Sequence, residues 1–214
     1  MVMKKRQRQQ IIVNHNFFKK WTPEMAYVFG FWFADGNITK PNNNFVYSVS
    51  FCSSDYGHLQ LIRKLMGSEH KIHNKRDNSY TLVIGSRTLW EDIQSIGGIP
   101  CKSLVATFPV VPCEYLSCFV RGVIDGDGSV MWSKRLRTFR PCVAIYGTQM
   151  FLMGINESIE KETGLPKRNI YQHKSKIPFI KWVGLNAKLL AHWCYSNSEN
   201  LSLLRKYYVA SQFE

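Results

Sequence analysis

Two stretches of the chain share an arrangement of small, apolar and acidic residues. "GFWFADG" covers residues 30–36 and "GVIDGDG" covers residues 122–128, so that Asp35 and Asp127 lie 92 positions apart. Each aspartate directly precedes a glycine at the end of an apolar segment that reads as a helix. A carboxylate in the last turn of a helix faces the negative end of the macrodipole, where it lowers stability. The same unfavourable aspartate occurs at the same position of both motifs, which indicates a functional role rather than a structural one.

Cation binding is the chemistry that fits two aspartates placed in this way. If the two helices pair about a pseudo-twofold axis, both carboxylates and both sets of terminal carbonyls meet in one region, where like charges repel. Hard divalent ions with oxygen ligands, Mg²⁺ above all, would settle that arrangement. Two or more such ions suit in-line hydrolysis of phosphodiesters.

Two simpler interpretations compete with this one. Each segment on its own reads as a core helix ended by a glycine cap. The stretch "DGDGSV" also begins like a calcium-binding loop, but position twelve from Asp125 is Leu136 where the EF-hand pattern needs a glutamate. The pairs Gly30 with Ala34 and Gly122 with Gly126 are each four residues apart, which predicts two small-residue faces that pack closely.

The charge of the chain indicates a polyanionic partner. There are 28 Lys and Arg against 15 Asp and Glu, which gives a net charge of +13 and a pI near 9.6. Nucleic acid is the leading candidate and an anionic membrane the lesser one. The longest apolar run, residues 25–34, is too short to cross a bilayer. Residues 1–20 read as a flexible basic arm without the apolar segment of an export signal, so we expect an intracellular protein.

The six cysteines show no C-x-x-C spacing. Neither a zinc site nor a redox motif is therefore indicated. We expect reduced thiols that serve as small core residues.

The order of the expected elements also repeats. Each copy has roughly an α-β-β-α-β-β-α order, which predicts an α+β fold with a first repeat at 21–97, a linker at 98–112 and a second repeat at 113–214. The expected helices are 23–36, 56–67, 87–98, 113–128, 149–164, 185–195 and 200–213. The expected strands lie at 44–55, around 68–86, in a hairpin ending at 139–148 and in a hairpin at 167–184.

The faces of the expected strands carry the candidate nucleic-acid contacts. Residues 44–54 alternate between apolar side chains and serines, as in a sheet with one wet face. A charged strand face is ordinarily just solvated, but several basic hairpins in one strongly basic chain favour a surface that contacts a polyanion. The candidates are Ser48, Ser50, Lys71, His73, Lys75, Arg137, Arg140, Arg168, Gln172 and Lys174.

The two motifs and the duplicated element order resemble the single-chain, two-repeat LAGLIDADG homing endonucleases. The resemblance covers residues 21–214 and is most specific at "GVIDGDG". It implies two antiparallel β-sheets that form a saddle over the DNA, with the motif helices packed at the centre. It also implies a monomer that holds divalent ions at Asp35 and Asp127, with the carbonyls of Ala34 and Gly126 as partners.

The resemblance further implies one basic residue per repeat near the active centre, for which Lys102 and Lys206 are the best matches by position. The penultimate acidic position of the motif is Asp125 in the second copy but Phe33 in the first, so no metal role follows for Asp125. The implied function is Mg²⁺-dependent, site-specific cleavage of double-stranded DNA across the minor groove of a long asymmetric target. Two alternatives share the fold: an RNA maturase that assists splicing of an intron, and a DNA-binding regulator without catalysis.

Overall fold

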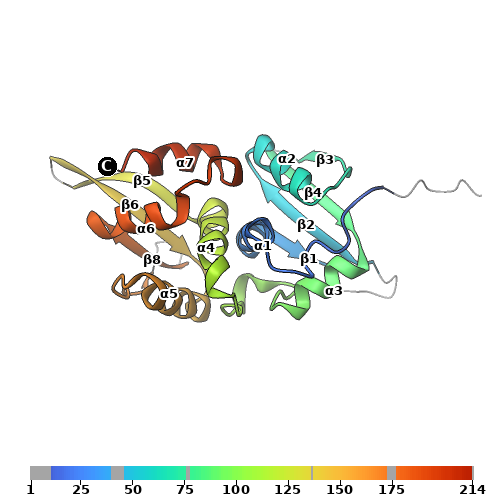
Figure 1. Cartoon of the computed structure of the whole chain (residues 1–214), viewed down its shortest axis with the longest axis horizontal. Helices are drawn as coiled ribbons and strands as arrows, with labels where there is room; N and C mark the ends of the chain where they lie inside the picture. Colours follow the sequence, from blue (N-terminus) through green and yellow to red (C-terminus); the bar gives the residue numbers. More distant parts are fainter. Residues whose placement is uncertain (1–10, 40–45, 76–77, 136, 173–176, 214) are drawn as a thin grey trace, which may run out of the picture.

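A computed structural model of the protein describes residues 11–39, 46–75, 78–135, 137–172 and 177–213. Helices α1 (Pro23–Asp35) and α4 (Cys113–Asp127) lie side by side at the centre, with one sheet on either side of the pair (Figure 1). The two motif helices therefore hold the two repeats together.

The first repeat builds the sheet formed by β1 to β4. The elements that follow α1 are β1 (Gly36–Ile38), β2 (Ser48–Ser53), α2 (Tyr56–Leu65), β3 (Ile72–Lys75), β4 (Ser79–Gly85) and α3 (Arg87–Ser95). Side chains of Thr22, Asp55 and Ser86 cap α1, α2 and α3 by accepting a hydrogen bond from a backbone N–H of the first turn. A short 3-10 turn, η1 (Lys102–Leu104), lies in the linker.

The second repeat has the same order of elements and adds a 3-10 turn and a helix at its end. After α4 come β5 (Ser129–Arg135), β6 (Thr138–Tyr146), α5 (Gln149–Thr163), β7 (Tyr171–Gln172), β8 (Pro178–Val183), α6 (Leu185–Tyr195), the 3-10 turn η2 (Glu199–Leu201) and α7 (Leu204–Ser211). The strand order is β1-β2-β4-β3 in one sheet and β5-β6-β8-β7 in the other, all antiparallel. The predicted α+β fold of two matching repeats is confirmed.

One face of each sheet packs against helices and forms the core. In the first sheet this face holds Val49, Phe51, Leu82 and Ile84, and in the second it holds Val143, Ile145, Ile180 and Trp182, all fully buried. We call the opposite face of each sheet its outer face. No helix of the described residues is both long and apolar enough to cross a membrane.

Four details differ from the sequence-based expectation. Residues 11–20 are not part of a flexible arm, because Phe17 and Phe18 are buried and Asn14 N–H donates to the Met66 carbonyl; residues 1–10 lie outside the described part. The strand expected at 44–55 is shorter, and β1 was not expected, since three residues carry no readable alternation. Cys101 and Cys113 are exposed and therefore are not core residues.

Candidate active site

The backbones of α1 and α4 touch where the sequence places its glycines. A Cβ atom added to Gly30 would overlap the carbonyl oxygen of Phe119, and one added to Gly122 would overlap that of Tyr27. A Cβ atom on Gly126 would overlap the side chain of Ala34. The predicted close packing of the small-residue faces is confirmed, and it brings the two helix C-termini together.

Asp35 and Asp127 end these helices and lie next to one another. Burial, the Asp127 carboxylate and a hydrogen bond between the two side chains raise the pKa of Asp35 from 3.8 to about 7. The neighbouring Asp127 carboxylate thus disfavours a negative charge on Asp35, as the paired-helix interpretation expects.

A buried lysine caps each of the two helix ends. The Lys206 ammonium donates to the carbonyls of Ile124 at 2.6 Å, Gly128 at 2.7 Å, Asp125 at 2.9 Å and Gly126 at 3.3 Å. A cation at this end of α4 offsets the helix dipole and satisfies carbonyls that have no partner within the helix.

Lys102 plays the same part at the end of α1. Its ammonium donates to the Gly36 carbonyl and, at 3.5 Å, to the Ala34 carbonyl, and it lies 4.9 Å from the centre of the Trp32 ring. The structure thus places both lysines at the motif helix ends.

Each lysine interacts electrostatically with the motif aspartates of both repeats. Burial lowers the pKa of Lys102 to about 8, and the nearby Asp127 and Asp35 oppose that change. Burial likewise lowers the pKa of Lys206 to about 8, against the attraction of Asp125, Asp35 and Asp127. Both amines keep a positive charge at neutral pH and face the aspartate pair.

The oxygen donors at this centre fit a hard divalent cation better than a transition metal. Among the described residues, no group of three or more His, Cys, Asp and Glu side chains forms a metal cluster. Two carboxylates and the carbonyls of Ala34 and Gly126 remain as donors. Those two carbonyls make the longest contacts of Lys102 and Lys206, at 3.5 and 3.3 Å, so they are the least committed to the lysines.

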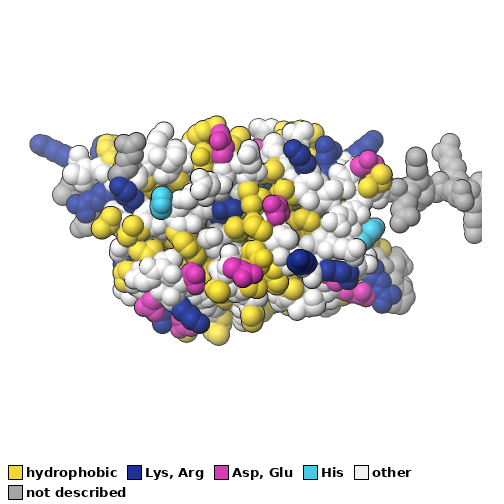
Figure 2. All heavy atoms as spheres, in the orientation of Figure 1, with side chains coloured by type: hydrophobic (Ala, Val, Ile, Leu, Met, Phe, Trp, Pro, Cys, Tyr) yellow, Lys and Arg dark blue, Asp and Glu magenta, His cyan; other side chains and the backbone are white. Residues whose placement is uncertain are grey.

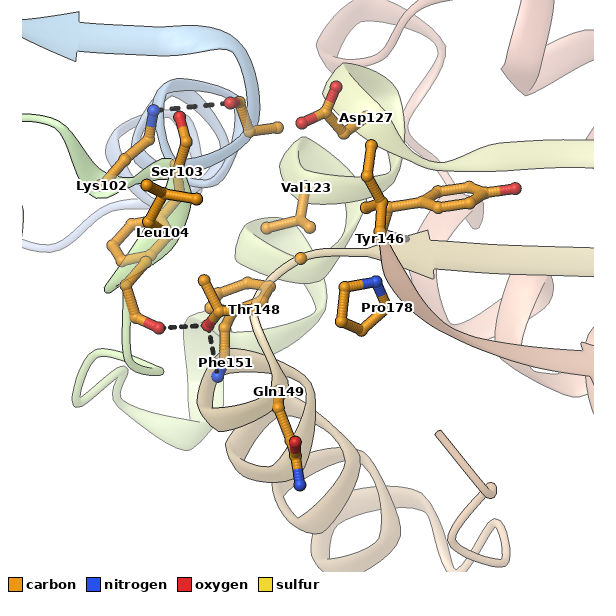
Figure 3. Close-up of a pocket in the computed structure, with 15 residues that line it drawn as sticks. Lys102, Ser103, Leu104, Val123, Asp127, Tyr146, Thr148, Gln149, Phe151 and Pro178 are labelled. Atoms are coloured by element: carbon orange, nitrogen blue, oxygen red, sulfur yellow. Dashed lines mark hydrogen bonds between the residues drawn. The ribbon is translucent and has the colours of Figure 1, made fainter. Parts of the chain in front are cut away.

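A cavity of about 820 Å³ opens beside the aspartate pair. Lys102 from the linker and Asp127 from α4 line it on opposite sides, with Val123 and Phe151 between them (Figure 3). Thr148 closes the far side, where its hydroxyl donates to the Ala106 carbonyl. The cavity gives solvent access to the carboxylate of Asp127.

The outer face of the first sheet continues directly from Asp35. Strand register puts Asn37, Ser50, His73 and Lys75 on this face, and the exposed Lys71 directly precedes β3. Ser48 has the same orientation but is only 8% exposed, so it offers little surface to a ligand.

In the second sheet only some of the candidate residues lie on the outer face. Arg140 pairs with Ser133 on the outer face, and Arg137 lies in the turn before β6. The orientation expected for Gln172 is wrong, because it pairs with Pro178 on the core side of β8, and Arg168 precedes β7 rather than lying in it. Lys174 lies outside the described residues.

Sequence reasoning missed Lys181 and Tyr171 on the outer face of the second sheet. Lys181 is exposed, pairs with Ala144 and lies 5.6 Å from the centre of the Tyr171 ring. The alternation in "PFIKWV", with Ile180 and Trp182 buried, could have revealed it. Lys and Arg side chains, dark blue in Figure 2, are visible toward both ends of the molecule, where the two sheets lie.

Similarity to solved structures is extensive in shape and low in sequence. The chain aligns with I-WcaI, a homing endonuclease solved on its DNA recognition sequence, at a TM-score of 0.61 and 11% identity over 91% of this chain and 90% of that one. It aligns with the LAGLIDADG homing endonuclease I-SmaMI bound to cleaved DNA at a TM-score of 0.57 and 13% identity, over 91% and 88% of the two chains. This is the LAGLIDADG homing endonuclease fold. A scan against protein-family models and a search of curated proteins give no match.

A third solved structure has the same fold. I-LtrWI, a further homing endonuclease of the fold solved on target DNA, aligns over 92% of this chain and 89% of that one at a TM-score of 0.50 and 13% identity. Nearly the whole chain thus aligns with structures of this fold. In this chain the two motif aspartates and the two lysines lie at the centre of the aligned region, where α1 and α4 end.

Proposed function

We propose that the protein is a site-specific, double-strand DNA endonuclease that works with divalent metal ions, Mg²⁺ being the expected one. The observation that carries the proposal is the adjacent pair of Asp35 and Asp127, each at the end of a motif helix and each beside a buried lysine. The neighbours of the same fold, solved as complexes with DNA, support it.

The aspartates and the lysines of the site have different roles in the proposed reaction. Asp35 and Asp127, with the carbonyls of Ala34 and Gly126, would hold the ions, and bound divalent ions would activate a water and stabilise the leaving oxygen of each scissile phosphodiester. Lys102 and Lys206 add positive charge where negative charge grows on the phosphates during cleavage. They also keep the helix carbonyls from repelling the DNA backbone.

The two outer faces supply the DNA-binding surface. Asn37 and Ser129 each follow a motif aspartate by two residues and begin the outer faces of their sheets. Continuing outward, Ser50, His73 and Lys75 line one sheet and Arg140 and Lys181 the other. Because the two sets differ, the proposed target is long and asymmetric, with base edges reached through the major groove and cuts across the intervening minor groove.

The experiment is cleavage of a DNA fragment that joins the sequences flanking the gene without the gene itself. Wild type should cut both strands with Mg²⁺ and neither strand with EDTA. Asp35→Asn and Asp127→Asn should abolish cutting and keep salt-sensitive binding, while Glu162→Gln, a change of an exposed acid on α5, should cut normally. Full activity in either aspartate variant would refute the assignment, and binding without cutting by wild type would indicate a regulator of the same fold.

A further inference from the structure

Two charged residues of α4 are buried and have no part in the proposed chemistry. Asp125 is 1% exposed and Arg121 is 4% exposed, and they lie one helical turn apart. A buried charge is costly unless hydrogen bonds compensate it. The hydrogen-bond partners of Asp125 and Arg121 therefore indicate the structural role of the two residues.

Both side chains bind the segment that joins α6 to α7, residues 196–203, which we call the connector. Arg121 donates from Nη1 to the Cys194 carbonyl just before it, at 2.5 Å, and from Nε to the Leu201 carbonyl within it, at 2.8 Å. The Asp125 carboxylate accepts from the Leu203 N–H at 2.7 Å. The connector is thus tied to α4 at both of its ends.

The same carboxylate also accepts from two buried hydroxyls. Tyr195, the last residue of α6, donates to Oδ1 at 2.6 Å, and Tyr27 of α1 donates to Oδ2 at 2.8 Å. Asp125 therefore joins the first repeat, α6 and the start of α7 at one point.

Helix α7 begins directly after Leu203 and carries Lys206. It has eight residues, of which only Lys206 and Ala210 are buried, whereas Leu204 and Tyr208 are 50% and 52% exposed. So short a helix is not stable without tertiary contacts. The backbone N–H of Lys206 donates to the Leu203 carbonyl. The hydrogen bond from the Leu203 N–H to Asp125 therefore fixes the position of the first turn of α7, from which the Lys206 side chain extends.

The first repeat holds its lysine by other means. The positions that correspond to Arg121 and Asp125 are Phe29 and Phe33, which pack among aromatic rings: Phe33 stacks on Phe151 with ring centres 5.2 Å apart. Lys102 comes from the 3-10 turn in the linker. A substitution of Asp125 should therefore disturb the position of Lys206 more than that of Lys102.

We propose that Asp125, together with Arg121, is a positioning residue for Lys206, which it holds in place through the connector. The consequence for catalysis rests on the proposed nuclease function. When this anchor is lost, the strand cut that depends on Lys206 slows more than the cut that depends on Lys102.

The first test does not depend on nuclease activity. Acylation of lysines by a water-soluble succinimidyl ester, read by mass spectrometry, compares Lys206 with Lys102 in the same molecule and with the exposed Lys64 as reference. Labelling of Lys206 relative to Lys102 should rise about fivefold in Asp125→Leu and about twofold in Tyr195→Phe, because the local structure around α7 opens more often. Asp125→Asn, which keeps an acceptor for Leu203, should retain most of the protection.

The outcomes separate cleanly. If Asp125→Leu unfolds, both lysines will be labelled alike, and Tyr195→Phe, which removes one hydroxyl, then decides. An unchanged ratio of Lys206 to Lys102 labelling in folded Tyr195→Phe overturns the inference.

The second test measures nicking of each strand. The strand that Lys206→Met slows most should also be the one that Asp125→Leu slows most, through kcat with KM within about twofold of wild type. Lys102→Met should slow the other strand more. Equal slowing of both strands by Asp125→Leu would refute the role in catalysis, whereas a wild type that cuts nothing would refute the proposed function and leave the labelling result standing.

Discussion

Removing one charge from the aspartate pair should stabilise the metal-free protein. A pKa raised from 3.8 to about 7 means that ionising Asp35 in the folded state costs on the order of 4 kcal/mol more than in the unfolded chain. Because the folded pKa is the higher one, the folded state pays no such cost below about pH 4, and the protein loses stability as the pH rises from about 4 through about 7. Asp35→Asn removes that loss.

The net gain should be smaller than this limit. Asparagine replaces the carboxyl group imperfectly, and Asp35 is only partly buried, so that solvent screens its charge and we expect about 2 kcal/mol at pH 8. For a chain of this length that corresponds to a rise in Tm of about 4 to 8 °C.

The assay is thermal unfolding in EDTA at pH 4.5, 6 and 8. The quantity to follow is the difference in Tm between Asp35→Asn and wild type, which cancels the titration of all other groups. It should grow with pH, whereas Glu162→Gln, an exposed change of the same charge, should show no such trend. A difference that stays flat from pH 4.5 to pH 8 would show that the two carboxylates do not repel one another as described.

Three further measurements test other parts of the structure. Ca²⁺ or Mg²⁺ should raise the Tm of wild type at pH 8 and raise that of Asp127→Asn much less, since an ion bound only by the folded state stabilises it; an equal rise in both would place the ion elsewhere. Gly122→Ala should destabilise by about 3 kcal/mol in urea unfolding because its Cβ atom meets the Tyr27 carbonyl, whereas Gly85→Ala, with nothing within 4 Å, should be nearly neutral. Lys75→Ala and Arg140→Ala should each reduce the slope of log affinity for DNA against log salt by about 1, and Lys64→Ala on α2 should leave the slope unchanged.

The motif helices were predictable because their signal is local. Glycines four residues apart and an aspartate before a terminal glycine can be read within one helix, and the repeat fixed the pairing of the two copies. Lys102 and Lys206 could be assigned only through the resemblance, since nothing near either residue in the sequence points to a helix end 66 to 82 positions away.

Long-range burial was not predictable. Phe17 and Phe18 follow a basic stretch and were grouped with it, although they pack into the core. The sequence gives Asp125 no metal role, since the first copy has Phe33 at that position. Its partners Tyr195 and Leu203 are 70 and 78 residues away, too far to be read from the sequence. The prediction of the sheet face on which Gln172 lies was wrong for a different reason. A one-residue difference in register exchanges the two faces of a strand.

The seam between α1 and α4 consists of main-chain atoms at Gly30 and Gly122, which has a consequence for engineering. A contact between main-chain atoms depends little on the surrounding side chains. Single repeats of related proteins could therefore be recombined at the linker into hybrids that keep the same packing of α1 against α4. The aromatic side chains of Phe33, Phe119 and Phe151, which cross from one half to the other, would then be the positions to redesign.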